Sequence, residues 1–100
     1  MAKLKILFVC GAGLGSSFAA QMSTEDVLDS LGVKADLEHT DISSASGTKC
    51  DIIITGSNFK TQFAKFNISK DTEIIYLNNI VSKTEIKEKI TPVLKKKKII

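Results

Sequence analysis

One short segment of the sequence joins a nucleophile to the parts of an anion site. It reads Cys10-Gly11-Ala12-Gly13-Leu14-Gly15-Ser16-Ser17. Glycines at alternate positions remove Cβ atoms and permit positive φ, so successive backbone N–H groups can turn inward around an anion. A helix that starts after this turn points its positive end at the same place, and Ser16 or Ser17 can cap that helix and donate a hydroxyl to an oxyanion. The segment therefore predicts a phosphate site lined by the backbone from Gly11 to Ser17.

Cys10 is the nucleophile that such a site would serve. A free cysteine has a pKa of about 8.5 and is only a few per cent thiolate at neutral pH. A helix terminus and converging amides favour the thiolate, and each unit by which they lower the pKa is worth about 1.4 kcal/mol. We expect a nucleophilic sulfur inside a preformed phosphate cradle. The alternative is that Cys10 only ends a strand and that the glycines only make a tight turn.

The segment departs from the phosphate loops of nucleotide-binding proteins and of phosphatases. A dinucleotide loop, G-x-G-x-x-G, needs a glycine where this chain has Ser16, and a triphosphate loop needs a lysine where it has Gly15. A cysteine phosphatase needs an arginine six residues after its cysteine, but all 14 basic residues of this chain are lysines. Its leaving-group acid typically lies in an Asp-Pro loop, whereas Pro92 follows a threonine. A cradle and a nucleophile without hydrolytic parts suit a protein that holds a phosphoryl group and hands it on.

The first half of the chain predicts a strand and a helix on either side of this segment. Residues 4–9 are nearly all apolar, as in a central parallel strand that is covered on both faces. Apolar residues at helical spacing predict a helix over 16–31, with Gly32 as its stop. Residues 34–40 alternate as in a half-exposed edge strand, and 41–49 should form a loop or a short helix.

The second half continues the alternation of strands and helices. Residues 51–55 predict a buried strand, and 73–77 predict a fourth strand. Between them Phe59, Phe63 and Phe66 recur at helical spacing, which predicts a short helix with these side chains in the core.

The last predicted element is an amphipathic helix. Ser82 and Glu85 form an S-x-x-E capping box ahead of it, and Pro92 should kink it. Strands that alternate with helices predict an α/β fold of the Rossmann-like or flavodoxin-like kind, a four-stranded parallel sheet with helices on both faces and strand order 2-1-3-4. Ligands bind such sheets at the switch point of the strand order, beside the loop that carries Cys10.

Length and composition fit one domain over residues 1–100, with 43% hydrophobic and 25% charged residues. The net charge of +3 comes from the run Lys95–Lys98, because without it ten lysines face eleven acidic residues. The basic character belongs to the tail, which argues against nucleic acid as a partner. The tail could attract an anionic membrane surface, but a frayed, solvated terminus is the favoured interpretation.

Several further features limit where the protein acts and which other reactive groups it could use. No apolar stretch approaches the roughly 20 residues that span a bilayer and no signal peptide precedes the first strand, so we expect a cytoplasmic protein. Cys10 and Cys50 fall at opposite ends of two predicted strands, too far apart for a disulfide, so both should be free thiols. No Cys/His cluster has metal-ligand spacing, and neither a metal nor another cofactor is expected. His39 could be a second phosphorylation site, but a solvated residue on an edge strand is the favoured interpretation.

The segment from Leu7 to Ser17 resembles the B component (enzyme IIB) of the bacterial phosphoenolpyruvate-dependent sugar phosphotransferase system, in particular its ascorbate and galactitol group. That group has a short strand near its N-terminus that ends in Cys-Gly-x-Gly-x-Gly-Ser-Ser, and this chain matches every fixed position. The buried strand 51–55 and the asparagines at 78–79 also lie where that family places them.

The resemblance implies a protein-phosphocysteine sugar phosphotransferase. Cys10 would accept a phosphoryl group from a phosphohistidine on the A component (IIA), with the amides of Gly11 to Ser17 around the phosphoryl oxygens. It would pass that group to an ascorbate-like or galactitol-like sugar bound by the membrane-embedded C component (IIC), transiently at the inner face of the membrane. Residues 55–58, after the third strand, either dock a partner there or form an ordinary strand-to-helix turn. A small cysteine phosphatase-like hydrolase and a non-catalytic anion-binding module remain as alternatives.

Overall fold

A computed structural model describes residues 4–9, 14–40, 42–45, 47, 49–65, 68, 71–79 and 81–99. Its four strands are all parallel and lie in the order β2-β1-β3-β4, as the sequence predicts. They are β1 (Leu4–Val9), β2 (Ala35–Thr40), β3 (Ile52–Gly56) and β4 (Glu73–Leu77). The central strands β1 and β3 are almost wholly buried, whereas β2 is half exposed at one edge of the sheet. This confirms the two buried strands predicted from apolar runs and the edge strand predicted from alternation.

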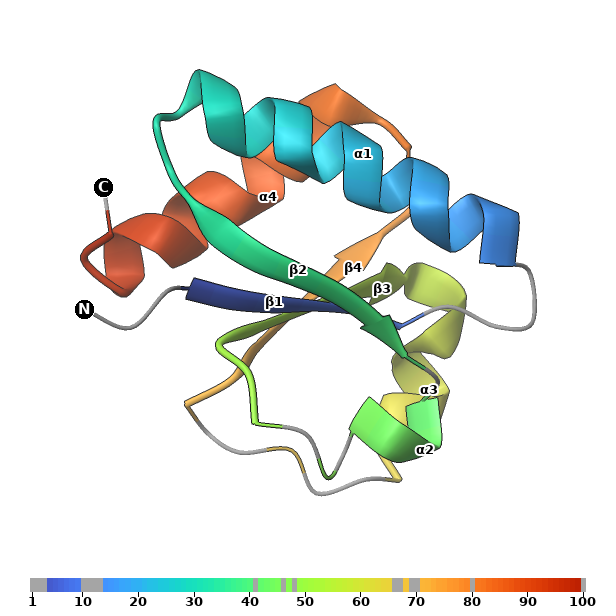
Figure 1. Cartoon of the computed structure of the whole chain (residues 1–100). Helices are drawn as coiled ribbons and strands as arrows, with labels where there is room; N and C mark the ends of the chain where they lie inside the picture. The colour runs from blue at the N-terminus through green and yellow to red at the C-terminus, as the bar shows by residue number, and fades with distance from the viewer. Residues whose placement is uncertain are drawn as a thin grey trace.

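Helices cover both faces of the sheet, which confirms the predicted layers (Figure 1). On one face lie the two long helices, α1 (Leu14–Ser30) and α4 (Lys83–Lys96). On the other face lie the short helices α2 (Ile42–Ala45) and α3 (Lys60–Phe63), the latter preceded by the 3₁₀ turn η1 (Ser57–Phe59).

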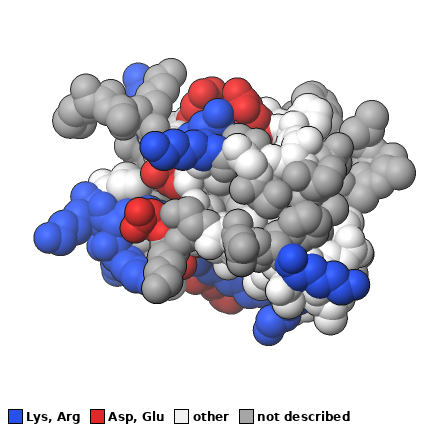
Figure 2. Space-filling view, turned by 90° about the horizontal axis from the view of Figure 1, so that it is seen from below, with Lys and Arg blue, Asp and Glu red and all other residues white. Residues whose placement is uncertain are grey.

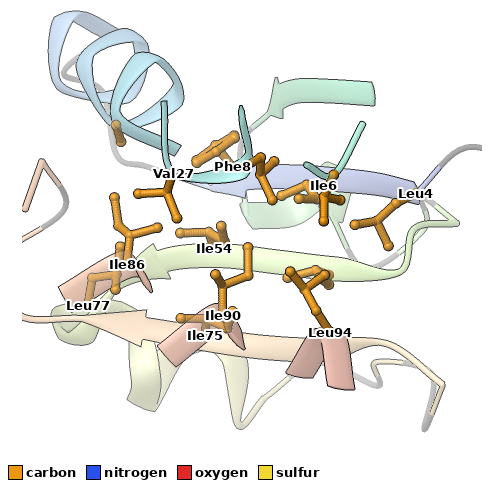
Figure 3. Packing of buried hydrophobic residues seen from close by; sticks show 14 residues of the cluster. Leu4, Ile6, Phe8, Val27, Ile54, Ile75, Leu77, Ile86, Ile90 and Leu94 are labelled. Atoms are coloured by element: carbon orange, nitrogen blue, oxygen red, sulfur yellow. The ribbon is translucent and has the colours of Figure 1, made fainter. Parts of the chain in front are cut away.

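Two apolar clusters hold these layers together, one on each face of the sheet. Alternate side chains of β1 separate between them, with Ile6 and Phe8 in the larger cluster and Leu7 and Val9 in the smaller. The larger cluster joins β1, β3 and β4 to α1 and α4 (Figure 3). The smaller cluster includes Phe63 of α3, which confirms its predicted place in the core. Phe66 lies outside the described residues.

The boundaries of α1 differ from the prediction at one end. The helix begins at Leu14, two residues earlier than expected, so Ser16 and Ser17 lie inside its first turns instead of capping it. The early start is physically reasonable because the first N–H groups of any helix have no intrahelical partner, so a glycine there costs little. At the other end Gly32 has a φ of 71°, and the N–H of Val33 bonds the carbonyl of Leu28, as in a glycine-terminated helix.

The final helix forms where the capping signal predicts it. The Ser82 hydroxyl accepts the N–H of Glu85 at 3.3 Å, which is half of a capping box. The other half does not form, because the Ser82 N–H donates to the carbonyl of Asn79 and the Glu85 carboxylate turns elsewhere. Pro92 lies inside α4, which continues to Lys96, and the kink stays a prediction.

The terminal lysines are more ordered than a frayed tail, so that interpretation is wrong for part of the run. Lys95 and Lys96 form the last turn of α4. Lys96 Nζ contacts Glu73 Oε1 at 2.5 Å, and Lys97 Nζ donates to the Asp71 carbonyl at 2.7 Å. Both contacts lie at the amino end of β4. Figure 2 shows lysines and acidic side chains side by side at the left of one face, the end at which Figure 1 places both termini, and further lysines at the lower right.

Candidate functional site

The parallel strands bring their carboxyl ends to one edge of the sheet, and β1 ends there at Val9. The next residue along the chain is Cys10, and the described structure resumes at Leu14 with α1. Cys10, Gly11, Ala12 and Gly13 lie outside the described residues. The strand order reverses at β1, because β2 pairs on one side of it and β3 on the other. The carboxyl end of β1 therefore lies at the switch point of the sheet, the usual ligand position in such folds.

The last residue before this segment is held firmly. Val9 is fully buried and pairs in register with Thr55 of β3. The Thr55 hydroxyl donates to the Val9 carbonyl at 2.6 Å, and Thr55 is only 1% exposed. Thr55 thus fixes the point from which the cysteine segment departs. It has no exposed surface to offer a partner, so the docking interpretation of 55–58 is wrong at this residue.

The residues that follow Thr55, at positions 56–58, differ in exposure. Gly56 is buried in β3 and pairs with Leu77, whereas Ser57 is exposed. The side chain of Asn58 is outside the described part of the structure. Only Ser57 among these three is shown in a position where it can meet a partner.

The amino end of α1 supplies the electrostatics of the site. The first four N–H groups of a helix have no intrahelical partner, and together they carry about half a positive charge. In α1 these groups include the amides of Leu14, Gly15 and Ser16, and the first turn carries no acidic residue. Because the count of unpaired groups starts at the residue before Leu14, the N–H of Ser17 is the fifth, and it ordinarily donates back into its own helix. The amides of 14–16 are therefore better anion donors than the amide of Ser17, and the side chains of 14–18 are outside the described part of the structure.

A second feature at this end of the sheet is the turn between β4 and α4, which carries the asparagines that the family resemblance singled out and whose hydrogen-bond partners the sequence did not reveal. Glu85 accepts the N–H of Asn78 at 2.7 Å and the N–H of Asn79 at 2.8 Å, one with each carboxylate oxygen. Lys89 Nζ bonds the same carboxylate at 2.8 Å. The bond from Lys89 and the two N–H bonds together lower the pKa of Glu85 from 4.5 to about 2. The S-x-x-E pattern was the signal, but it pointed to Ser82 as the partner of Glu85.

The remaining nucleophiles lie elsewhere. His39 is exposed on the edge strand β2, as the favoured interpretation holds. Cys50 is a free thiol that precedes β3, at the opposite end of the sheet from the carboxyl end of β1. It lines a cavity of about 660 Å³ together with Lys5 and Thr72. Burial, and secondly the charge of Asp51, raise the pKa of the Cys50 thiol, which makes it a poor nucleophile.

Within the described ranges, no group of three or more His, Cys, Asp or Glu side chains is arranged to hold a metal ion. A search of the same ranges for a helix long and apolar enough to cross a membrane finds none.

Comparison with known proteins places these features in context. The sequence model of the family described as "PTS system, Lactose/Cellobiose specific IIB subunit" matches residues 5–92. The chain is 28% identical over 93 residues to the ascorbate-specific PTS system EIIB component of Mycoplasma pneumoniae (strain ATCC 29342 / M129 / Subtype 1), covering 91% of this chain and 95% of that protein. It also resembles the solved lactose-specific IIB component domain of the phosphoenolpyruvate:carbohydrate phosphotransferase system from Streptococcus pneumoniae, with a TM-score of 0.51 and 14% identity over 94% and 93% of the two chains. At that identity the likeness to the solved domain concerns the fold alone.

Proposed function

Because the chain belongs to the family of PTS lactose/cellobiose-specific IIB subunits, we propose that it is a phosphoryl carrier whose carrier atom is Sγ of Cys10. It accepts the phosphoryl group from a phosphohistidine of a IIA protein and passes it to a sugar bound by a IIC membrane permease. The protein carries the phosphoryl group in the cytoplasm and binds transiently at the inner face of the membrane. The family match spans the whole cysteine segment, which supports the assignment.

The observation that carries the proposal is the position of Cys10 between two well-defined elements. It directly follows Val9, which is buried and held by Thr55, and it comes four residues before Leu14, the first residue of α1. A thiolate at the amino end of a helix is stabilised by the helix dipole and by unpaired N–H groups. The same groups stabilise the oxygens of a phosphoryl group.

The transfer proceeds in two displacements at phosphorus. In the first, the Cys10 thiolate forms an S–P bond while the N–P bond of the donor phosphohistidine breaks, and the imidazole keeps the electron pair. In the second, a sugar hydroxyl gives its proton to water and forms an O–P bond while the S–P bond breaks and returns the thiolate. Phosphoryl transfer depends mainly on positioning and electrostatic stabilisation, and neutral amides in residues 11–17 supply the stabilisation here.

The acceptor we propose is an ascorbate-like sugar, with a galactitol-like sugar as the second choice. The Cys-Gly-x-Gly-x-Gly-Ser-Ser spacing fits both types. The relative from Mycoplasma pneumoniae is named as ascorbate-specific, which favours the first.

Intact mass spectrometry tests the carrier chemistry. The chain is incubated with phosphoenolpyruvate, the general phosphotransfer proteins and a candidate IIA protein. Wild type and Cys50→Ser, the matched control, should each gain one phosphate, about 80 Da, and Cys10→Ser should gain none. Steady hydrolysis of an aryl phosphate without an adduct would instead support the cysteine phosphatase-like alternative. Phosphate binding that survives Cys10→Ser, with no adduct in wild type, would support the anion-binding module.

A further inference from the structure

The turn between β4 and α4 is fixed to two helices although it lies on the surface. From α4, Glu85 binds the N–H groups of Asn78 and Asn79. Inside the turn, the Asn79 side-chain oxygen accepts the N–H of Val81 at 3.1 Å. From α1, the hydroxyl of Ser23 donates to the carbonyl of Val81, also at 3.1 Å. The backbone at Asn78, Asn79 and Val81 is therefore held in place before any partner binds.

Glu85 is itself held in place. Lys89, one helical turn further on, contacts its carboxylate at 2.8 Å and also donates to the carbonyl of Tyr76 in β4. The Glu85 side chain is only 16% exposed. In contrast, Asn78 and Asn79 are exposed, and Val81 is 43% exposed although it is a large apolar residue. The network thus holds the backbone at Asn78, Asn79 and Val81 and leaves these three residues exposed.

The turn lies within reach of any protein that docks over the end of β1. Strand β3 separates β1 from β4, and neighbouring strands are about 4.8 Å apart, so the ends of β1 and β4 are about 10 Å apart. A stable protein–protein interface covers about 800 Å² on each partner, which is a disc with a radius of about 16 Å. A protein centred on the end of β1 would cover the turn as well.

We propose that Glu85 is a positioning residue for docking of the phosphoryl-donor protein. It holds the turn so that the exposed side chains of Asn78, Asn79 and Val81 meet the donor in one fixed arrangement. This inference rests on the proposed function, because the donor is a partner only if Cys10 accepts its phosphoryl group. In this step both reacting groups belong to proteins, so their orientation must come from the contact between protein surfaces. A turn that is ordered in advance spares the free energy of ordering it on binding, so Glu85 acts on affinity and not on the chemical step.

The test compares Glu85→Gln with Glu88→Gln in single-turnover transfer from a phosphorylated IIA protein at a series of donor concentrations. Glu88 is exposed on the same helix, so both variants remove one negative charge from α4. Glu85→Gln places an N–H₂ donor against a backbone N–H donor and loosens the turn. We expect the half-saturating donor concentration to rise about fivefold in Glu85→Gln, with a saturating rate within about twofold of wild type. Glu88→Gln should behave as wild type.

Two further measurements keep the test decisive. Amide exchange of Asn78 and Asn79, followed by NMR, should accelerate in Glu85→Gln and not in Glu88→Gln. Ser23→Ala loosens the same turn from α1 and should raise the half-saturating concentration in the same direction, even where Glu85→Gln folds poorly. Equal donor dependence in all variants, or a lower saturating rate at unchanged half-saturation, would overturn the positioning role alone. No phosphoryl uptake by wild type would overturn the proposed function, and this inference with it.

Discussion

Cys50 precedes β3 and Cys10 follows β1 in the sequence, so the two thiols should differ sharply in reactivity. Cys50 precedes β3, where burial and the charge of Asp51 raise the pKa of its thiol. Cys10 follows β1 and comes just before the positive end of α1, which favours the thiolate. We expect iodoacetamide at pH 7 to alkylate Cys10 at least about tenfold faster than Cys50, as peptide mass mapping would show. Inorganic phosphate should slow the reaction at Cys10 alone. Equal rates at both thiols would contradict the proposed cradle.

The buried hydroxyl of Thr55 should matter for stability and for transfer together. Thr55→Val keeps the side-chain shape but removes the hydrogen bond to the Val9 carbonyl, 2.6 Å long in the native chain. We expect a loss of about 1–2 kcal/mol in the free energy of unfolding, measured by urea denaturation. Thr55→Ser keeps the donor and is the matched control. If phosphoryl uptake were as fast in Thr55→Val as in wild type, the end of β1 would not need this bond to position Cys10.

At the scale of elements, the start of α4 gains acid-sensitive stability from Glu85. The pKa of its carboxyl is about 2 in the folded chain against an ordinary 4.5. A lowered folded-state pKa stabilises the fold above the unfolded pKa, and that stabilisation is lost as pH falls toward the folded value. Wild type should therefore be more stable than Glu85→Gln above about pH 5, and the gap should shrink between pH 4.5 and 2. Thermal melting across this range measures the gap, and a gap independent of pH would show that Glu85 is not a charged partner of the turn.

The sequence predicted the elements better than it predicted their connections. Apolar runs and alternation identify β1 to β4 because burial on one or both faces of a sheet selects those patterns directly. The amino end of α1 was misplaced because glycine and serine favour turns in isolation, whereas the free N–H groups of a first helical turn tolerate both. The partners of Glu85 were not predicted, since the S-x-x-E pattern assigns its carboxylate to the Ser82 N–H, whereas in the structure it accepts the N–H groups of Asn78 and Asn79.

The same distinction holds for the candidate site. Cys10 and its glycines could be proposed as a site from local spacing alone, because consecutive residues build a phosphate loop. The contributions of Thr55 and of the Asn78–Asn79 turn come from other strands. Their approach to the end of β1 depends on strand order and register, which no local pattern specifies.

At the scale of the whole molecule, the lysine run Lys95–Lys98 and the proposed reactive site belong to opposite ends of the sheet. Lys96 and Lys97 contact Glu73 and Asp71 at the amino end of β4, whereas Cys10 follows the carboxyl end of β1. A strand spans about 17–20 Å. A membrane surface attracted to this lysine run would therefore lie about that far from the carboxyl end of β1, at the amino ends of the strands. Attraction of the run to anionic lipid would orient the reactive edge away from the permease.

Replacing all four residues of the run Lys95–Lys98 by glutamine should therefore leave transfer to the membrane partner unchanged at low and at high salt. Stability should fall only slightly, by about 0–1 kcal/mol for each exposed ion pair lost, because such pairs are screened by water and salt. Sugar phosphorylation by permease-containing vesicles, measured beside soluble uptake from the IIA protein, checks both steps. A fall in vesicle activity confined to low salt, with soluble uptake intact, would mean that the lysines guide membrane docking. The protein would then have to approach the permease with a different face from the one at the carboxyl ends of the strands.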